Sequence, residues 1–424
     1  MMINLKRLGK KHLDKNSSAT SFSTIVKKDP TVRQTLGELD DCLEQIGLRK
    51  LIQTRSRSQT ARTVVTDVFS ECENDLRDDE SSKQASLASK TCVERVHRHD
   101  FKTISYLGKG AFSGVQKVKN HSGETFALKA LDSSRIKTPD ELTTAAIDLG
   151  MEAKILSELN HKNIIKLRGV CSSTFSYSYS ECTDEGYFLV LDLLEDVLSQ
   201  KLIRWKKHSR LRLALENRRA ILPTANVKMM YKRMQSVALG IVEGMVYLHK
   251  KGIVIRDLKP ANIGFDRNGN VRLFDFGMAR RLEDCDKGEI CGSLRYMAPE
   301  VANSEGYFFK TDVYSFGIIL CELCSLTVPY DQMMKKPCGS KEFSRRVAKD
   351  GMRPSLDQIA CDATKELIKD CWKPSPSQRP SFEEIHERIV RITSCDRSET
   401  RGDLTRNYRK KFCSRLERQG DRNV

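Results

Sequence analysis

One stretch of the chain gathers two carboxylates, an amide and a lysine at short, fixed spacing. Asp257 is followed two residues later by Lys259 and five residues later by Asn262, and Asp275 comes 13 residues after the asparagine. Asn262 and Asp275 offer the oxygen ligands that Mg²⁺ prefers, and Asp257 can accept the proton of a hydroxyl group. Lys259 can neutralise negative charge. Together these groups could transfer a phosphoryl group to a hydroxyl.

A glycine-rich segment upstream could hold the phosphates. Gly108, Gly110 and Gly114 lie between two strand-like stretches, where glycines let backbone N–H groups approach a polyphosphate closely. Lys129 follows near the end of an apolar strand, where an ammonium group is tolerated only beside an anion. A nucleotide phosphate and a helix carboxylate are the candidate anions. The glycines alone are weak evidence, because glycine-rich hairpins are common.

The elements that must position these side chains are strands followed by helices. Residues 101–120 and 124–131 are predicted as strands broken by a glycine-rich turn, with a second turn at Ser122-Gly123. Thr138, Pro139 and Glu141 form a helix start with a capping box, and we expect helix to continue over residues 152–167. The remaining predicted elements are a strand at 187–195, helices at 228–249 and 309–326, the latter wholly buried, and a last helix opened by a capping box at 381–384.

Residues 101–392 resemble a eukaryotic protein kinase domain. The glycine-rich loop, the strand lysine, the catalytic loop, Asp-Phe-Gly (275–277) and Ala-Pro-Glu (298–300) occur in that order at suitable intervals. The resemblance implies an α+β, two-lobed fold with a small β-rich lobe, a larger helical lobe and ATP between them. It places the domain at 99–392, with the first lobe over 99–192 and the second over 193–392.

The resemblance also implies roles for single residues. Asp257 is the catalytic base, Asn262 and Asp275 are the Mg²⁺ ligands, and Lys259 and Lys129 contact phosphates. Glu152 fits the helix glutamate that pairs with Lys129 better than Glu141 or Glu158, and Arg379 is implied to pair structurally with Glu300. Residues 189–194 would form the adenine hinge. The residues expected to bind ATP are Leu107, Gly108, Lys109, Gly110, Ala111, Phe112, Ser113, Gly114, Val115, Ala127, Lys129, Leu191, Asp192 and Leu194.

Two features indicate the acceptor. Lys259, two residues after the base, resembles the Ser/Thr kinases, and so does the segment 292–297. The segments 312–317 and 371–382 resemble the tyrosine-kinase-like group, whose members mostly phosphorylate Ser or Thr. We therefore predict a Ser/Thr protein kinase of intracellular signalling, acting in the cytoplasm on protein substrates, with dual specificity left open.

Departures from the family pattern keep other functions in view. Ser113 occupies the third glycine position, and Ile255 stands where the family usually has His, so we expect lowered activity. The alternative function is a pseudokinase scaffold that acts by binding, but all the principal polar groups are intact. A nucleic-acid-binding protein rests only on the net charge of +17, and no aromatic-rich binding motif supports it.

The segment between Asp275 and Gly292 contains no Ser, Thr or Tyr. A phosphorylated loop would normally answer Arg256 with charge-assisted hydrogen bonds. Our hypothesis is that carboxylates of this segment stand in for phosphate, and the alternative is a mobile acidic loop without a fixed partner. The candidate carboxylates are Glu283, Asp284, Asp286 and Glu289.

Composition bounds the remaining possibilities. The chain has 424 residues, and its charge of +17 favours acidic, phosphorylated or membrane-surface partners. Its 14 cysteines are too few and too dispersed for a disulfide scaffold. We expect Cys321 and Cys324 to be core residues, and acidic neighbours make a redox role of Cys285 and Cys291 unfavourable. No apolar run is long enough to span a bilayer.

The segments outside the kinase-like region are polar. Residues 1–98 are predicted to be mostly disordered, apart from a short amphipathic helix at 36–52 that could dock on the main domain or a partner, or have no role. Residues 1–28 are basic and Ser-rich, which leaves an organelle transit peptide as a minor alternative. A basic insertion (195–226) could bind an acidic partner through 201–219 or form a solvated helix. Residues 393–424 are predicted to be a basic tail.

Overall fold

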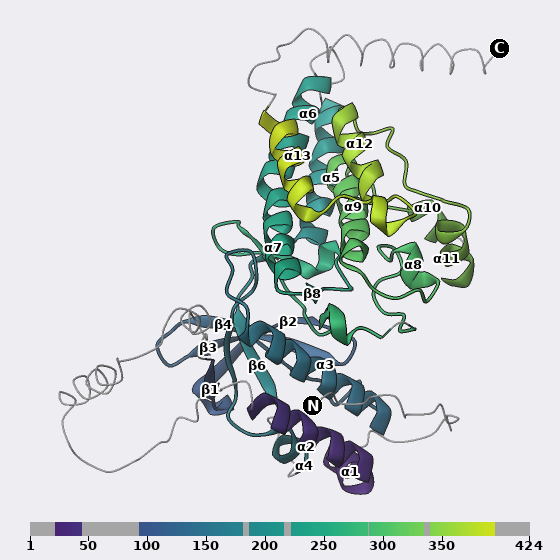
Figure 1. Ribbon diagram of the computed structural model, residues 1–424. Coiled ribbons are helices and arrows are strands. Elements are labelled where there is room, and N and C mark those ends of the chain that lie inside the picture. Colours follow the sequence, from purple (N-terminus) through teal and green to yellow (C-terminus); the bar gives the residue numbers. More distant parts are fainter. Residues whose placement is uncertain are drawn as a thin grey trace, which may run out of the picture.

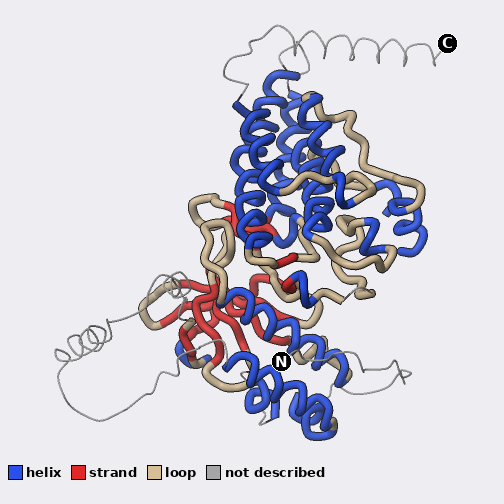
Figure 2. The backbone as a smooth tube through the Cα atoms, in the orientation of Figure 1, coloured by secondary structure: helices blue, strands red, loops and turns tan. Residues whose placement is uncertain are grey.

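Strands and helices occupy separate parts of the molecule. The computed structural model describes residues 22–44, 93–180, 186–215, 222–286, 288–334 and 340–394. Most of its strands gather at one end, and a bundle of helices forms the other (Figures 1 and 2). This is the two-lobed α+β architecture that the sequence predicts.

A six-stranded sheet forms the smaller lobe within the described residues, in the order β1-β5-β6-β4-β3-β2. The first three strands after β1 pair antiparallel through the predicted turns, whereas β1 runs parallel to β5. One long helix and one short helix accompany the sheet. The elements are β1 (Glu94–Val96), β2 (Phe101–Lys109), β3 (Ser113–Asn120), β4 (Thr125–Leu131), α3 (Pro139–Ser157), β5 (Leu167–Cys171), α4 (Phe175–Ser180) and β6 (Phe188–Asp192).

The register of this sheet brings the glycine-rich turn next to the strand lysine. Val115 on β3 lies opposite Lys129 on β4 and opposite Gly108 on β2. On the other side of β4, Ala127 lies opposite Leu191 of β6. Residues predicted to bind the nucleotide therefore come together from four neighbouring strands.

Helix α3 begins as its sequence predicts and ends ten residues early. The Thr138 side chain accepts a hydrogen bond from the Glu141 backbone at 3.2 Å, and the Glu141 carboxylate accepts one from the Thr138 backbone at 3.2 Å. The prediction of helix through residue 167 is wrong, because α3 ends at Ser157. Beyond it the backbone N–H of Ile165 donates to the Leu273 carbonyl at 2.9 Å, so this segment pairs with a strand of the other lobe instead of its own preceding turn.

The larger lobe is built around α9, in which every residue from Thr311 to Cys324 is buried, as predicted. The predicted 228–249 helix is α6, a short π-helical segment (Met234–Ala238) and α7 in succession. The helices are α5 (Leu198–Leu215), α6 (Leu222–Arg233), α7 (Leu239–Lys250), α8 (Pro299–Ala302), α9 (Phe309–Ser325), α10 (Asp331–Met334), α11 (Ser340–Ala348), α12 (Asp362–Cys371) and α13 (Phe382–Ser394). Short strands carry the loops between them: β7 (Asp196–Val197), β8 (Ile253–Val254), β9 (Ile263–Phe265), β10 (Val271–Leu273) and β11 (Arg280–Arg281).

A buried ion pair fastens the start of α8 to the segment before α13. Arg379 donates to both carboxylate oxygens of Glu300, at 2.7 and 2.8 Å, and both side chains are almost fully buried. Arg379 also donates to the carbonyls of Lys373 and Lys310. The predicted pair is thus confirmed, as is the capping box in which Ser381 and Glu384 exchange hydrogen bonds.

Two helices precede the kinase-like region and pack on the smaller lobe. They are α1 (Phe22–Lys28) and α2 (Pro30–Glu44), and they lie beside α3 and α4 (Figure 1). Asp29 accepts hydrogen bonds from the backbones of Thr31 and Val32 and so caps α2 six residues before the predicted start. Residues 45–52 of the predicted helix, and residues 1–21 of the predicted transit peptide, lie outside the described residues.

The remaining sequence predictions concern the cysteines of α9, membrane-spanning helices, the basic insertion and the segments outside the kinase-like region. Cys321 and Cys324 are core residues of α9, as expected. Over the part of the chain that the structure describes, no helix has the length and apolarity to cross a membrane. In the basic insertion, Trp205 of α5 packs partly buried against the core, and the Lys201 ammonium lies 3.6 Å from the ring centroid of Phe265. The acidic partner and the cytoplasmic location stay predictions. Within residues 1–98, predicted to be mostly disordered, the structure describes α1, α2 and β1.

Candidate active site

Lys129 joins the two lobes through a pair of carboxylates. Its ammonium lies 2.6 Å from Glu152 of α3 and 2.7 Å from Asp275, which follows β10. Burial alone would lower the pKa of Lys129, but Asp275 and Glu152 raise it above its usual value. Lys129 is therefore charged throughout the neutral pH range. Of the three candidate glutamates, Glu152 is the one that contacts this lysine.

The predicted base and its lysine lie together on the loop after β8. The Lys259 ammonium donates to Asp257 at 2.5 Å and to the Ser293 hydroxyl at 3.0 Å. The second Asp257 oxygen accepts a hydrogen bond from the Ser293 backbone at 2.8 Å. Asn262 donates to the Asp257 carbonyl at 3.1 Å, which closes the loop on itself. The base, the lysine and the amide are thus held in one compact constellation.

Asn262 and Asp275 can supply the donor set of a hard cation. The Phe274 backbone donates to the Asn262 carbonyl at 3.1 Å, which ties the loop to the segment that carries Asp275. The charge of Lys129 lowers the pKa of Asp275, so this carboxylate is ionised at neutral pH. Since the Asn262 amide nitrogen is engaged with Asp257, its oxygen is left as the donor. One carboxylate and one amide oxygen fit Mg²⁺, which binds few protein ligands beside water and phosphates.

The glycine-rich segment forms a tight turn between β2 and β3. The Gly110 backbone donates to the Ser113 carbonyl at 2.8 Å, and a Cβ on Gly110 would lie 2.7 Å from the Ser113 hydroxyl. Arg135 donates to the Gly110 carbonyl and closes the turn from outside. A side chain at 110 would therefore require the Ser113 hydroxyl to move. The role of Leu107–Val115 in nucleotide binding stays a prediction.

Arg256 forms an ion pair with one of the four acidic residues that were proposed to contact it. Its side chain is 1% exposed and donates to Glu289 at 2.5 Å and to the Met278 carbonyl at 2.6 Å. The guanidinium also lies 5.0 Å from the ring centroid of Tyr307. The acidic segment is therefore not free of fixed contacts, because Glu289 is paired with Arg256.

The neighbouring Gly292 allows this segment to reach the catalytic loop. Gly292 has φ +101°, and a Cβ there would lie 2.5 Å from the Arg256 carbonyl. Any other residue would push the chain away from Asp257. Cys285 and Cys291 lie in the same segment, and burial raises the pKa of both thiols, that of Cys285 to about 11. This agrees with the prediction against a thiolate-based redox role.

The catalytic loop is held in place by a residue of α9 to which the sequence pattern assigned no role. Asp312 of α9 is 1% exposed and accepts hydrogen bonds from the backbones of Ile255 (3.0 Å) and Arg256 (3.1 Å). His249 lies 3.0 Å from the same carboxylate. These bonds support Arg256 at φ +67°, a conformation that is strained for a residue with a side chain. A lone Asp in an apolar helix was the available signal.

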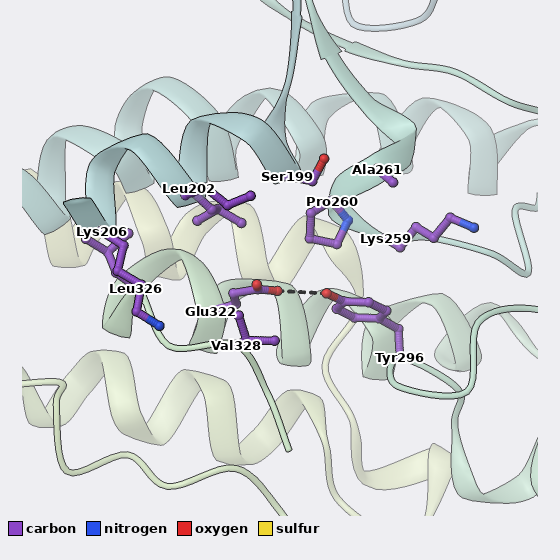
Figure 3. A pocket seen from close by; sticks show the side chains of 11 residues that line it. Ser199, Leu202, Lys206, Lys259, Pro260, Ala261, Tyr296, Glu322, Leu326 and Val328 are labelled. Carbon is purple, nitrogen blue, oxygen red and sulfur yellow. Dashed lines mark hydrogen bonds between the residues drawn. The ribbon is translucent and has the colours of Figure 1, made fainter. Parts of the chain in front are cut away.

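A cavity of about 240 Å³ opens beside the catalytic loop and is shown in Figure 3. Leu202 of α5, Pro260 of the loop and Val328 after α9 contribute to its mostly apolar wall, and the Tyr296 hydroxyl donates to Glu322 at 2.8 Å across it. Apart from Lys259, none of the residues predicted for catalysis, ATP or metal lines this cavity. It is therefore distinct from the site around Lys129.

Comparison with known proteins gives one consistent family. Residues 101–389 match the model of the protein kinase domain. A Dictyostelium discoideum protein named "Probable serine/threonine-protein kinase" is 29% identical over 306 residues, which cover 72% of this chain and 20% of that protein. "Ribosomal protein S6 kinase alpha-3" of Mus musculus and of Homo sapiens is 30% identical over 294 residues, which cover 68% of this chain and 34% of the relative. The chain thus spans a fifth to a third of the length of these relatives. Because S6 kinases are among them, the narrower resemblance to the tyrosine-kinase-like group is not confirmed.

Proposed function

The chain belongs to the protein kinase family, and on that premise we propose that it transfers the γ-phosphoryl group of ATP to Ser or Thr hydroxyls of protein substrates in signalling. The observation that carries the proposal is the assembled site: Lys129 bonded to both Glu152 and Asp275, next to a catalytic loop with its base in place.

In the proposed reaction, Asp257 accepts the hydrogen bond of the substrate hydroxyl and orients its oxygen toward the phosphorus. Lys259, already at 2.5 Å from Asp257, neutralises charge on the transferred group. Lys129 holds the other phosphates through its ammonium. Asn262 and Asp275 would hold Mg²⁺, which when bound neutralises phosphate charge. Positioning and electrostatics therefore supply the rate enhancement.

Specificity for Ser or Thr is supported by Lys259 and by the names of the relatives, two of which denote serine/threonine or S6 kinases. The Lys259 ammonium donates to both Asp257 and the Ser293 hydroxyl, so it lies directly beside the base. A short aliphatic hydroxyl reaches the base from a chain held close to the loop, whereas a tyrosine needs a chain held farther away. We therefore assign Ser and Thr as acceptors.

We further propose that activity does not depend on phosphorylation within 276–291. The segment has no Ser, Thr or Tyr, and the Glu289 carboxylate occupies the Arg256 guanidinium as a phosphate would. A carboxylate carries one charge where a phosphate carries nearly two, so the contact is weaker than a phosphorylated one.

Labelled ATP, Mg²⁺ and a general Ser/Thr substrate test the activity, with the full-length protein beside Asp275→Asn and a matched control, Asp357→Asn, at an exposed carboxylate outside the site. We expect incorporation on Ser or Thr for the wild type and Asp357→Asn, and none for Asp275→Asn. Absence of incorporation in all three, while nucleotide still binds, would favour the scaffold and point to Ile255 as the defect.

A further inference from the structure

Helix α3, which carries Glu152, needs cover on the face that points away from the active site. Its buried residues cover a wide arc of the helix, and those at 143, 146, 150, 153 and 157 follow one stripe of Thr, Ala, Gly, Ala and Ser. A buried stripe of a helix must be packed against a neighbouring element. The small residues of this stripe allow a neighbouring helix to come close.

The neighbour is α2, which lies outside the region that matches the kinase family. Val32, Leu36, Leu39 and Leu43 recur at intervals of four, three and four residues, and each is at most 4% exposed. They form the apolar face of α2, and α2 packs against both α3 and α4. Figure 1 shows α1 and α2 alongside α3, on the side of α3 that faces away from the larger lobe.

Leu39 approaches α3 closely at Gly150. A Cβ on Gly150 would lie 3.1 Å from Leu39 Cδ2, so the missing side chain of Gly150 is the space that Leu39 occupies. Gly150 precedes Glu152 by two residues, which on a helix is a rotation of about 200°. Leu39 therefore packs on the face of α3 nearly opposite Glu152. It supports the helix from the side remote from Lys129.

Asp40 attaches α2 to a second element of the smaller lobe, helix α4. Its carboxylate accepts hydrogen bonds from the backbones of Phe175 (2.5 Å) and Ser176 (3.0 Å) at the start of α4. Phe175 stacks on Tyr187 with ring centroids 3.8 Å apart, directly before β6. Hence α2 is attached both to the helix that bears Glu152 and to the segment that leads into the predicted adenine hinge.

We infer that residues 22–44 are a positioning element of the active site, in which Leu39 and Asp40 hold α3 where Glu152 reaches Lys129. The inference rests on the proposed kinase function. Activity would then depend on a segment that lies outside the region matching the kinase family. Displacement of α2 from α3 would lower that activity.

The test uses full-length protein with Leu39→Ala, the size-conserving Leu39→Met, and Gln34→Ala as a control at an exposed position of α2. We expect Leu39→Ala to lower kcat/KM for ATP about tenfold, and the other two to change it less than about twofold. In a Glu152→Gln background, Leu39→Ala should cost nothing further, because both changes remove the same interaction. If the two losses instead multiply, or if Leu39→Ala lowers only the melting temperature, α2 does not act through Glu152.

A second readout separates this inference from the proposed function. Amide hydrogen exchange over 139–157 should accelerate in Leu39→Ala and, to a smaller extent, in Asp40→Asn, whether or not the protein transfers phosphate. An inactive wild type would overturn the kinase proposal. Unchanged exchange in α3 in both variants would overturn the positioning role, and Asp40→Asn keeps that test available if Leu39→Ala does not fold.

Discussion

Replacement of Glu289 by alanine tests whether a carboxylate fixes the segment before Gly292. The substitution removes the 2.5 Å hydrogen bond to Arg256, whose side chain is 1% exposed and keeps its charge. The Met278 carbonyl and the Tyr307 ring remain as partners of the guanidinium. The segment loses its ionic contact without losing its apolar packing, so the effect falls on the ordering of the loop.

The free energy lost in Glu289→Ala follows from the burial of Arg256 and Glu289. A hydrogen bond to a charged group contributes about 1.5–3 kcal/mol. The Glu289 side chain is 43% exposed, and solvent screening therefore reduces the expected loss to about 1–2 kcal/mol. If this free energy keeps the loop in its active arrangement, kcat/KM for a Ser/Thr peptide falls by about 5- to 30-fold. Glu289→Gln, which keeps an acceptor oxygen, should lie between wild type and alanine.

The assay compares phosphatase-treated proteins at saturating ATP and varied peptide. Glu283→Ala is the matched control, because Glu283 is an exposed carboxylate of the same segment. We expect it to behave as the wild type. Loss of wild-type activity on phosphatase treatment, or equal activity of Glu289→Ala and Glu283→Ala, would refute the assignment of Glu289 as a substitute for phosphate.

Three further predictions concern stability, pH dependence and reactivity. Arg379→Leu leaves the buried Glu300 carboxylate unpaired and should lower the free energy of unfolding by about 3–5 kcal/mol, measured by urea titration; a loss below about 1 kcal/mol would contradict the role of this pair. Lys129 lowers the pKa of Asp275, so the stability gained from their contact is present above the unfolded value of about 3.9 and is lost as the pH falls through the lower folded value. The wild type should therefore keep a constant urea midpoint difference from Asp275→Asn between about pH 5 and pH 8, and a difference that already shrinks at pH 6 would be inconsistent. Burial raises the pKa of Cys285 to about 11, so iodoacetamide should modify it at pH 8 more than a hundredfold more slowly than a free cysteine of pKa near 8.5; mass spectrometry of the tryptic peptides decides.

Local chemistry determined much of this protein from the sequence. Chemistry at fixed spacing needs residues of fixed type, so Asp257, Asn262 and Asp275 could be recognised without a structure. Capping boxes at Thr138 and Ser381 depend on residues three positions apart, and the structure contains both. A helix that is apolar over most of its circumference, such as 309–325, is predicted to be buried.

Contacts between distant segments were decided only by the tertiary structure. The sequence offered four acidic residues for Arg256, and packing against Tyr307 and the catalytic loop selected Glu289. It assigned no role to Asp312, because the partners of this carboxylate lie more than 50 positions away.

The end of helix α3 and the docking of α2 were likewise decided by contacts between distant segments. Helix α3 ends at Ser157, and the backbone of Asn163 and Ile165 farther along pairs with Leu273 of β10 instead of continuing the helix. The apolar pattern of residues 36–52 predicted an amphipathic helix, which the structure places at Pro30–Glu44, but not the surface that it covers. That surface exists only once the small residues of α3 are brought together, since a periodic pattern specifies which face is apolar, whereas complementary shape specifies what that face contacts.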